Sequence, residues 1–445
     1  MMQIDLIIEA RWIVPIEPQG VLERYALAVH DGRVEALLPT DVARARYSPR
    51  RHVVLGEHAL IPGLINLHTH AAMTLMRGLA DDLALMDWLQ RHIWPVEMRE
   101  VSPDFVYDGT LLACAEMLRG GITLFNDMYF FPEAAARAAL AAGMRAALGM
   151  IVVDFPSPYA SDSLDYLTKG MAARDQLRDQ PLISFCFAPH APYSVRDKAL
   201  SQVATYANEL DVPIHIHLHE TQDEITQSEG HDGRRPLARL ADLGLIGPNL
   251  LAVHAVHLTD SEVELLASQG CHVAHCPSSN LKLASGMAPV AKLISAGVNV
   301  GIGTDGAASN NRLDMFSEMR QTALLAKAVS NDPTVLPAHQ ALTMATLNGA
   351  RALGLDAHVG SLLPGKAADI VAVDFSRPEL APCYDPVSHL VYVASRQDVS
   401  HVWVAGELLV EDGVLTRSAF RDLNSRAAHW HARIAAAPVT GGRDC

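Results

Sequence analysis

The sequence lacks the features that mark several classes of protein. Its six cysteines are scattered without a Cys-x-x-Cys pair, so we interpret them as small buried or idle thiols. No run approaches the roughly 20 apolar residues of a membrane span. The opening Met1–Glu9 has neither a basic segment nor a long apolar one, so no export signal is predicted. We therefore expect a cytoplasmic protein.

Positive charge is also scarce. Lys and Arg together number 35 against 50 Asp and Glu, which gives a formal net charge of −15. Such a chain is poorly suited to bind phosphates, so nucleic acid is not an expected partner, although a nucleoside could still be a substrate. The content of 49% hydrophobic and 19% charged residues is typical of a folded globular protein.

Strand-like and helix-like segments alternate between about Leu60 and Leu355. Eight such βα units in one run predict a closed parallel (β/α)₈ barrel, which we assign to residues 60–367. Helices are expected at Asp104–Arg119, Glu133–Ala142, Lys198–Leu210 and Ser261–Ser268. The strands are expected to begin near Ile65, Thr123, Met144, Leu182, Val212, Leu250, His272 and Asn299.

Short strands broken by turns occupy both ends of the chain. Asp31-Gly32 is a hairpin signal between two apolar runs, and a similar strand, turn and strand return over residues 368–413. We therefore expect a smaller β-sandwich built from residues 1–59 and 368–424. Residues 425–445 are expected to form a C-terminal helix that fades into a loose tail.

Candidate functional residues lie where the barrel strands end, which is where barrels carry their active sites. His68 and His70 end the first strand two positions apart, so both can face the barrel mouth. His217 ends the fifth strand, and Glu220 follows it by three positions. Neutral imidazole is a good ligand for zinc and similar metals.

Other strand ends are polar as well. His190 ends the fourth strand, His254 the sixth, and Asp305 follows the eighth directly before a glycine. So many polar groups at apolar strand ends would be costly in a plain core, because each buried group needs a partner. A metal ion supplies one, so we predict a metal centre at the barrel mouth.

The fifth strand offers more histidines than one ligand position needs. His215 and His219 share a face with His217 in an extended strand. We choose His217 as the ligand because it stands three positions before Glu220. The other two are interpreted as neighbours, and His257 as a core histidine.

These segments together resemble the amidohydrolase superfamily, and within it the 5′-methylthioadenosine/S-adenosylhomocysteine deaminases. The likeness runs from the first strands to about Gly413 and is carried by Pro62–His70, His217–Glu220, Val253–His254 and Gly303–Asn311. It implies hydrolytic deamination of an adenine nucleoside to the inosine analogue and ammonia. It also implies one divalent ion, for which we favour Zn²⁺ although iron or manganese suits the same ligands. The metal ligands it implies are His68, His70, His217 and Asp305.

The resemblance also assigns the catalytic roles. Glu220 would shuttle protons to the ring nitrogen and the departing ammonia, and His254 would hold the attacking water. Asp305 would accept the proton of that water, whose pKa a metal ion lowers to about 7. Binuclear relatives carry a bridging lysine on the fourth strand, but Leu182–His190 has none, so one ion is expected. A His-x-Glu…Pro-Cys-x-x-Cys arrangement, typical of another class of zinc deaminases, is missing.

The segment Ala71–Glu100 would close over the substrate in such an enzyme. The resemblance implies that Trp88 packs against the nucleoside and Glu97 binds the ribose hydroxyls, while His190 bonds to the purine. Glu97 suits that role because a carboxylate can accept from two vicinal hydroxyls. Trp94 is expected to pack into a core instead.

One departure from the family bears on the substrate. Relatives that accept S-adenosylhomocysteine use arginines after the third strand to bind its carboxylate, but residues 146–173 contain none. Met150 and Asp154 stand in that region instead. We therefore expect 5′-methylthioadenosine and adenosine to be preferred over S-adenosylhomocysteine.

Two other functions remain open on the sequence alone. One is hydrolysis of another amino-aromatic ring, such as guanine, a pterin or a triazine, which Glu97 disfavours because a free base has no ribose. The other is a non-catalytic scaffold, which the full set of metal ligands disfavours. The family also implies a homo-oligomer.

Overall fold

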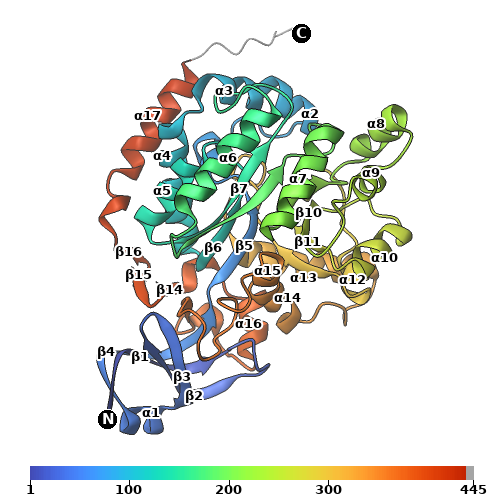
Figure 1. Cartoon of the computed structure of the whole chain (residues 1–445). Coiled ribbons are helices and arrows are strands. Elements are labelled where there is room, and N and C mark those ends of the chain that lie inside the picture. Colours follow the sequence, from blue (N-terminus) through green and yellow to red (C-terminus); the bar gives the residue numbers. More distant parts are fainter. Residues whose placement is uncertain (437–445) are drawn as a thin grey trace.

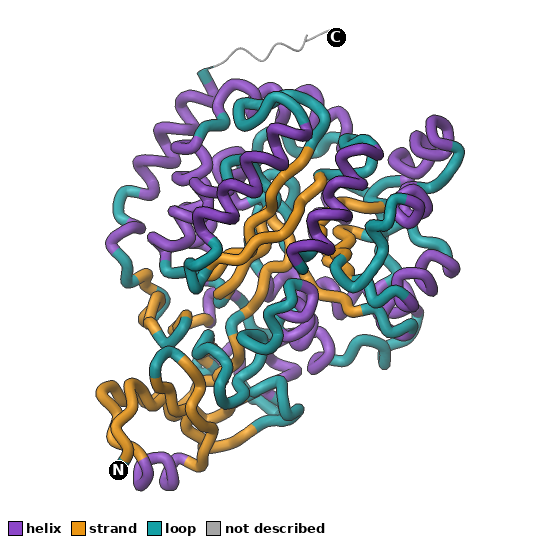
Figure 2. The backbone as a smooth tube through the Cα atoms, viewed as in Figure 1, coloured by secondary structure: helices purple, strands orange, loops and turns teal. Residues whose placement is uncertain are grey.

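The computed structural model describes residues 1–436, and its central feature is a parallel barrel (Figures 1 and 2). Eight strands pair in chain order, so the predicted (β/α)₈ barrel is confirmed. Every strand expected from the sequence is present. They are β5 (Leu64–Thr69), β6 (Ile122–Asp127), β7 (Arg145–Val152), β8 (Ile183–Pro189), β9 (Ile214–Leu218), β10 (Leu250–His254), β11 (His272–His275) and β12 (Asn299–Ile302).

The first and last barrel strands meet at their carboxyl ends. The amide of Thr304 donates to Oδ1 of Asn66 at 2.9 Å, and the amide of Asp305 donates to the carbonyl of His68 at 2.9 Å. Gly303 makes this approach possible, because a Cβ there would lie 2.7 Å from the backbone nitrogen of His68. The junction brings Asp305 beside the histidines of β5.

Helices surround the barrel and cover its strands (Figure 2). The four helices expected from the sequence are confirmed within one residue at each end, as α4 (Pro103–Arg119), α5 (Pro132–Ala142), α7 (Asp197–Leu210) and α10 (Asp260–Ser268). The others are α6 (Ser163–Leu177), α8 (Gln222–Asp232), α9 (Pro236–Asp242), α11 (Pro277–Lys282), α12 (Val290–Ser295), α13 (Met315–Ser330), α14 (Ala338–Met344), α15 (Leu347–Ala352) and α16 (Pro386–Tyr392).

A helical segment between β5 and α4 lies over the barrel mouth. It consists of η1 (Ala71–Met76), α2 (Leu85–Trp88), the π-helical turn η2 (Leu89–Ile93) and α3 (Trp94–Glu100). None of the helices in the described part of the chain is long and apolar enough to cross a membrane.

A second sheet is built from both chain ends, as predicted, and lies below the barrel in Figure 1. Its eight strands form one hydrogen-bonded sheet, antiparallel except where β1 pairs with β4. The Asp31-Gly32 turn joins β2 and β3, as its sequence indicated. In sheet order the strands are β16 (Val414–Leu415), β15 (Glu407–Glu411), β14 (Val399–Val404), β13 (Ile370–Asp374), β4 (Tyr47–Pro62), β1 (Met2–Ile13), β2 (Leu22–His30) and β3 (Arg33–Pro39).

Short helices complete the chain, and α17 is the longest of them. The expected C-terminal helix is α17 (Leu423–Ala435), whose Trp430 packs on Phe105 with ring centroids 5.1 Å apart. The end of the tail that was expected to be loose, residues 437–445, lies outside the described residues. The remaining pieces are α1 (Thr40–Arg46), η3 (Pro378–Leu380), η4 (Arg396–Asp398) and η5 (Ser418–Phe420).

Candidate metal centre and active site

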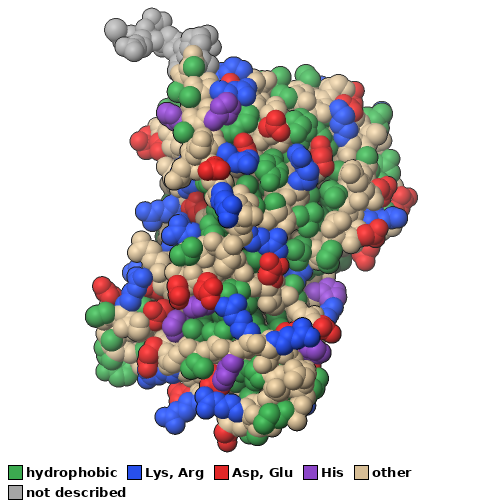
Figure 3. Space-filling view, turned by 90° about the vertical axis from the view of Figure 1, so that its left-hand side faces the viewer, with side chains coloured by type: hydrophobic (Ala, Val, Ile, Leu, Met, Phe, Trp, Pro, Cys, Tyr) green, Lys and Arg blue, Asp and Glu red, His purple; other side chains and the backbone are tan. Residues whose placement is uncertain are grey.

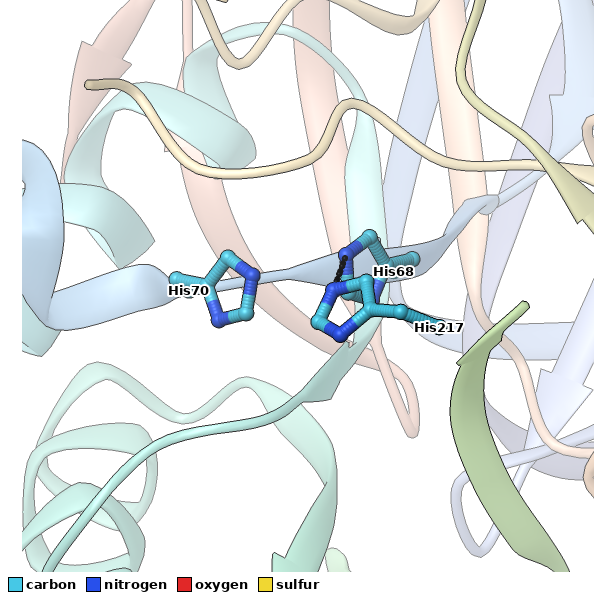
Figure 4. Close-up of side chains that lie close together, drawn as sticks. All are labelled: His68, His70 and His217. Carbon is cyan, nitrogen blue, oxygen red and sulfur yellow. Dashed lines mark hydrogen bonds between the residues drawn. The ribbon is translucent and has the colours of Figure 1, made fainter. Parts of the chain in front are cut away.

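Histidines from β5 and β9 converge with Asp305 at the barrel mouth. Nε2 of His217 lies 3.3 Å from Nε2 of His68, as Figure 4 shows. Oδ1 of Asp305 lies 3.2 Å from Nε2 of His68 and 3.3 Å from Nε2 of His70. The structure therefore brings together all four residues predicted as metal ligands.

The far side of each imidazole has a defined partner. Nδ1 of His70 lies 2.6 Å from the carbonyl oxygen of Met128, and Nδ1 of His217 lies 2.7 Å from the carbonyl oxygen of His190. A carbonyl can only accept, so Nδ1 carries a proton in both rings, and Nε2 is the nitrogen left to face the cluster.

Asp305 is held as firmly as the histidines. Its backbone is left-handed, with φ of 62°, and the amide of Gly306 donates to its Oδ1 at 2.7 Å. Ser279 donates to its Oδ2 at 2.6 Å. Burial alone would raise the pKa of Asp305, but His68 and His70 hold that pKa well below its usual range.

The arrangement fits a cation. Imidazole nitrogens and a carboxylate oxygen converge on one small buried space, and they are the donor set that a divalent ion such as zinc binds. At the barrel mouth two groups meet the spacing expected of metal ligands, with the ligand atoms of each group within 4.8 Å of one another. The groups are His68, His70 and His217, and His68, His254 and Asp305.

Glu220 and His254 lie together beside this cluster. Oε2 of Glu220 is 3.8 Å from Nε2 of His254, whose Nδ1 lies 2.8 Å from Oδ1 of Asn280. Both side chains are almost fully buried. Burial is the main cause of the raised pKa of Glu220, so this carboxyl can hold a proton more readily than an exposed one.

The backbone that carries Glu220 is fixed by a second carboxylate. Oε1 of Glu224 accepts from the amide of His219 at 3.0 Å, and its Oε2 accepts from the amide of Glu220 at 2.8 Å. His219 stands there in a left-handed conformation with φ of 54°, which ends β9. Glu224 therefore stabilises the turn that aims Glu220 at the cavity.

A cavity opens from the cluster, and all five residues predicted to contact the substrate line it: Trp88, Glu97, His190, Glu220 and Asp305. Trp88 and Glu97 are nine positions apart, and at about 100° per residue a regular α-helix would place them on opposite faces. The π-helical turn η2 lies between them and adds one residue to a turn. Both side chains consequently face the cavity.

On the helical segment between β5 and α4, called the lid segment below, Glu97 is the one acidic side chain that lines the cavity. Tyr129 donates its hydroxyl to Oε1 of Glu97 at 2.8 Å. Burial raises the pKa of Glu97 to about 7, although the bond from Tyr129 opposes the rise. A buried carboxylate of this kind is suited to bind donor groups of a ligand.

His190 is held in its neutral form. Burial lowers its pKa to about 3, and its Nδ1 lies 2.9 Å from Oγ of Ser194. Because Ser194 orients the ring, Nε2 is available to the cavity for a hydrogen bond with a ligand.

The histidines that the sequence left open now have distinct positions. Nε2 of His215 lies 2.8 Å from Nδ1 of His68, so His215 supports a predicted ligand. His219 lies outside the cavity, where its Nε2 accepts from the amide of Leu237 at 3.1 Å. The bend after β9 turns His219 away, and an extended strand would not. His257 lies 2.7 Å from the carbonyl oxygen of Ser285 through its Nε2, as befits a structural histidine.

Three further residues around the cavity wall have defined positions. Trp94 packs against the apolar core, as expected, but it also lines the cavity, where its ring centroid lies 5.7 Å from that of Phe155. Met150 does not face the cavity; it packs at Gly170 of α6, and its neighbour Ile151 on β7 points inward. Asp154 also points elsewhere, accepting from the amide of Arg196.

Some site residues escaped the sequence analysis. Ser279 and Asn280 follow β11, and Tyr129 follows β6. The rule that functional groups follow barrel strands would have found all three, had it been applied to the second and seventh strands. Glu224 carries no such signal, because only the bend at His219 brings its carboxylate under the backbone of Glu220.

A parallel barrel with a histidine–aspartate cluster and a buried acid at its mouth is the architecture of a metal-dependent hydrolase. The model of the Amidohydrolase family matches residues 59–409. The chain belongs to this amidohydrolase family.

Individual relatives agree with this assignment. The chain is 48% identical over 434 residues to a 5-methylthioadenosine/S-adenosylhomocysteine deaminase of Teredinibacter turnerae, covering 97% of this chain and 98% of that protein. The crystal structure of an adenosine deaminase from Xanthomonas campestris with bound zinc superposes with a TM-score of 0.96, at 50% identity, over 98% of this chain and 100% of that one. An atrazine chlorohydrolase from Arthrobacter aurescens (TM-score 0.87, 23% identity, 96% and 100% covered) shares the fold.

Proposed function

We propose that this enzyme hydrolytically deaminates an adenine nucleoside to the inosine analogue and ammonia. The observation that carries the proposal is the placement of Glu97 in the same cavity as Glu220 and His254. Glu97 is suited to bind ribose hydroxyls. Glu220 and His254 flank the cluster where the base would react. The relatives named as deaminases of adenine nucleosides support the same assignment.

The reaction needs one divalent ion, for which we propose Zn²⁺ held by His68, His70, His217 and Asp305. Their convergent lone pairs fit such an ion, and no lysine stands on β8 to bridge a second one. When bound, the ion supplies Lewis-acid chemistry that makes a water molecule acidic enough to provide hydroxide near neutral pH.

Residues around the cluster carry out the proton transfers. With its raised pKa, Glu220 protonates the ring nitrogen beside the attacked carbon and then delivers a proton to the departing amino group. His254, held by Asn280, orients the attacking water. Asp305 accepts the proton that this water loses and passes it to Glu220, which delivers it to the departing amino group. The proton of the hydroxyl group added to the ring then restores Glu220 as the carbonyl forms.

The cavity wall positions the nucleoside. Trp88 packs against the substrate, His190 bonds to the purine, and Glu97 accepts from the ribose hydroxyls. Ile151, Val153 and Phe155 give the cavity an apolar wall beside these groups. Such a wall suits a methylthio substituent better than a charged amino-acid group.

We propose 5′-methylthioadenosine as the preferred substrate, with adenosine also accepted and S-adenosylhomocysteine used less well. Residues 146–173 contain no arginine to pair with the carboxylate of the last compound. This order rests on the missing arginine and on the apolar wall, while the carboxylate of Asp154 accepts from the amide of Arg196.

Side-by-side assays of ammonia release test the proposal. The metal-loaded enzyme should deaminate 5′-methylthioadenosine with a higher kcat/KM than guanine or ammeline, an aminotriazine. A higher kcat/KM for either free base would refute a nucleoside deaminase. A higher value for S-adenosylhomocysteine than for 5′-methylthioadenosine would refute the substrate order alone.

We also propose that the protein works in the cytoplasm as a homo-oligomer and does not bind nucleic acid. The five cysteines in the described part of the chain are free thiols, which suits a reducing compartment. On the face shown in Figure 3, basic and acidic side chains are interspersed without a continuous basic stripe, which suits a small-molecule enzyme. Sedimentation of the purified protein tests the oligomeric state.

A further inference from the structure

Glu97 has few hydrogen-bond partners for a buried acid. Its residue is only 9% exposed, and apolar Trp88 and Ile93 line the cavity beside it. Within residues 1–436, its carboxylate accepts one hydrogen bond, from Tyr129 to Oε1. Buried carboxylates normally accept several, so the remaining acceptor positions of Glu97 are available to a ligand.

Tyr129 is placed to decide which acceptor positions stay free. It follows β6 of the rigid barrel, is 4% exposed, and packs on Phe130 with ring centroids 5.3 Å apart. Its hydroxyl crosses to Glu97 on α3 of the lid segment. The bond occupies one site on Oε1 and leaves Oε2 free, which matches the two donors of a vicinal diol.

We infer that Tyr129 is a positioning residue that holds Glu97 ready to accept both hydroxyls of a ribose, so that the site selects ligands with an intact 2′,3′-diol. The inference rests on the proposed function and adds the residue that enforces the ribose requirement. Tyr129 acts through Glu97 and need not touch the base or the reacting atoms.

The charge state of Glu97 supports this role. Burial raises its pKa to about 7, while the bond from Tyr129 opposes that rise. Tyr166 of α6 is near enough for the charge of Glu97 to act on its pKa, but its hydroxyl donates to Ser157 and not to Glu97. Loss of the Tyr129 hydroxyl removes a stabilising bond to the ionised form, so the pKa of Glu97 rises further. A protonated Glu97 accepts from a diol less well.

Binding of two products that differ only in the diol tests the inference. Calorimetry on the metal-loaded enzyme would compare inosine with 2′,3′-dideoxyinosine for the wild type and Tyr129→Phe. We expect Tyr129→Phe to weaken inosine binding roughly tenfold, as for loss of a hydrogen bond to a charged group. The same substitution should weaken the binding of dideoxyinosine by a factor several-fold smaller. The weakening of inosine binding on acidification should also begin at a higher pH in the variant.

Two further variants make the test specific. Tyr166→Phe removes another buried tyrosine hydroxyl, one that donates to Ser157 outside the cavity, and should leave the ratio of the two affinities unchanged. In a Glu97→Ala background, Tyr129→Phe should no longer change that ratio, because the group through which it acts is gone.

Two results would overturn the inference in different ways. If Tyr129→Phe weakens both products equally, or neither, Tyr129 does not position Glu97, while deamination of nucleosides by the wild type would leave the proposed function standing. If the wild type deaminates no nucleoside and binds neither product, the proposed function fails, and the inference fails with it.

Discussion

Nε2 of His215 lies 2.8 Å from Nδ1 of His68, inside the barrel and away from solvent. The two rings are nearly perpendicular, with an interplanar angle of 79°. His68 is the one predicted ligand histidine whose Nδ1 partner is another imidazole; those of His70 and His217 are backbone carbonyls. A side chain can be changed by mutation, so this support of the metal centre is open to direct test.

His215→Phe should weaken metal binding. The substitution leaves Nδ1 of His68 without its partner, and loss of such an outer contact typically costs about 10- to 100-fold in metal affinity. Competition with a chromophoric chelator measures the change. His219→Phe is the matched control, because His219 lies on the same segment and its ring contacts the Leu237 amide and Glu262 outside the cavity. It should lower the melting temperature without changing metal affinity, and equal losses of affinity in both variants would contradict the assignment.

Glu220→Gln should abolish most turnover while the metal stays bound. The amide keeps the shape of the side chain but cannot shuttle protons, so kcat should fall by about 10²- to 10⁴-fold. Steady-state assays, with metal content measured on the same samples, test whether kcat falls while the metal stays bound. Glu229→Gln, on the exposed face of α8, should behave as the wild type. A variant that loses metal in step with activity would mean that Glu220 serves the metal centre instead.

Glu97 makes substrate binding depend on pH. Its pKa is raised to about 7 by burial, and the ionised form accepts from the ribose. Binding that needs this ionised form is present above the raised pKa and is lost as pH falls through it. The KM for a nucleoside should therefore rise below about pH 7, whereas Glu97→Gln should remove this dependence. A wild-type KM that stays flat between pH 8 and pH 6, roughly one unit either side of that pKa, would count against the assignment.

Gly303→Ala should destabilise the barrel at the junction of its first and last strands. The added Cβ would lie 2.7 Å from the backbone of His68, which cannot move aside as a side chain could. Overpacking of this kind typically costs about 1–3 kcal/mol, so the melting temperature should fall clearly. Gly247→Ala adds the same methyl group where nothing lies within 4 Å and should have little effect. Equal melting temperatures for the two variants would contradict close contact at the junction.

Much of the molecule could be predicted from local patterns. Alternating apolar segments indicated eight parallel strands, and a barrel brings their carboxyl ends to one rim. His68, His70, His217 and Asp305 therefore needed only the strand-end rule to be placed together. Residues whose role depends on a change of local direction could not be predicted in this way. Trp94 faces the cavity only because η2 interrupts the helix, and His219 leaves it only because its backbone turns left-handed.

The sequence by itself determined the barrel, the sheet shared by both chain ends and the strand ends that carry the candidate metal ligands, because strand periodicity and strand ends are local properties. Tertiary structure decided which groups support that set. The bonds from His215 to His68, from Ser279 to Asp305 and from Tyr129 to Glu97 each join elements far apart in the chain. No spacing in the sequence encodes such contacts, since they exist only after the strands close into a ring and the lid segment covers its mouth.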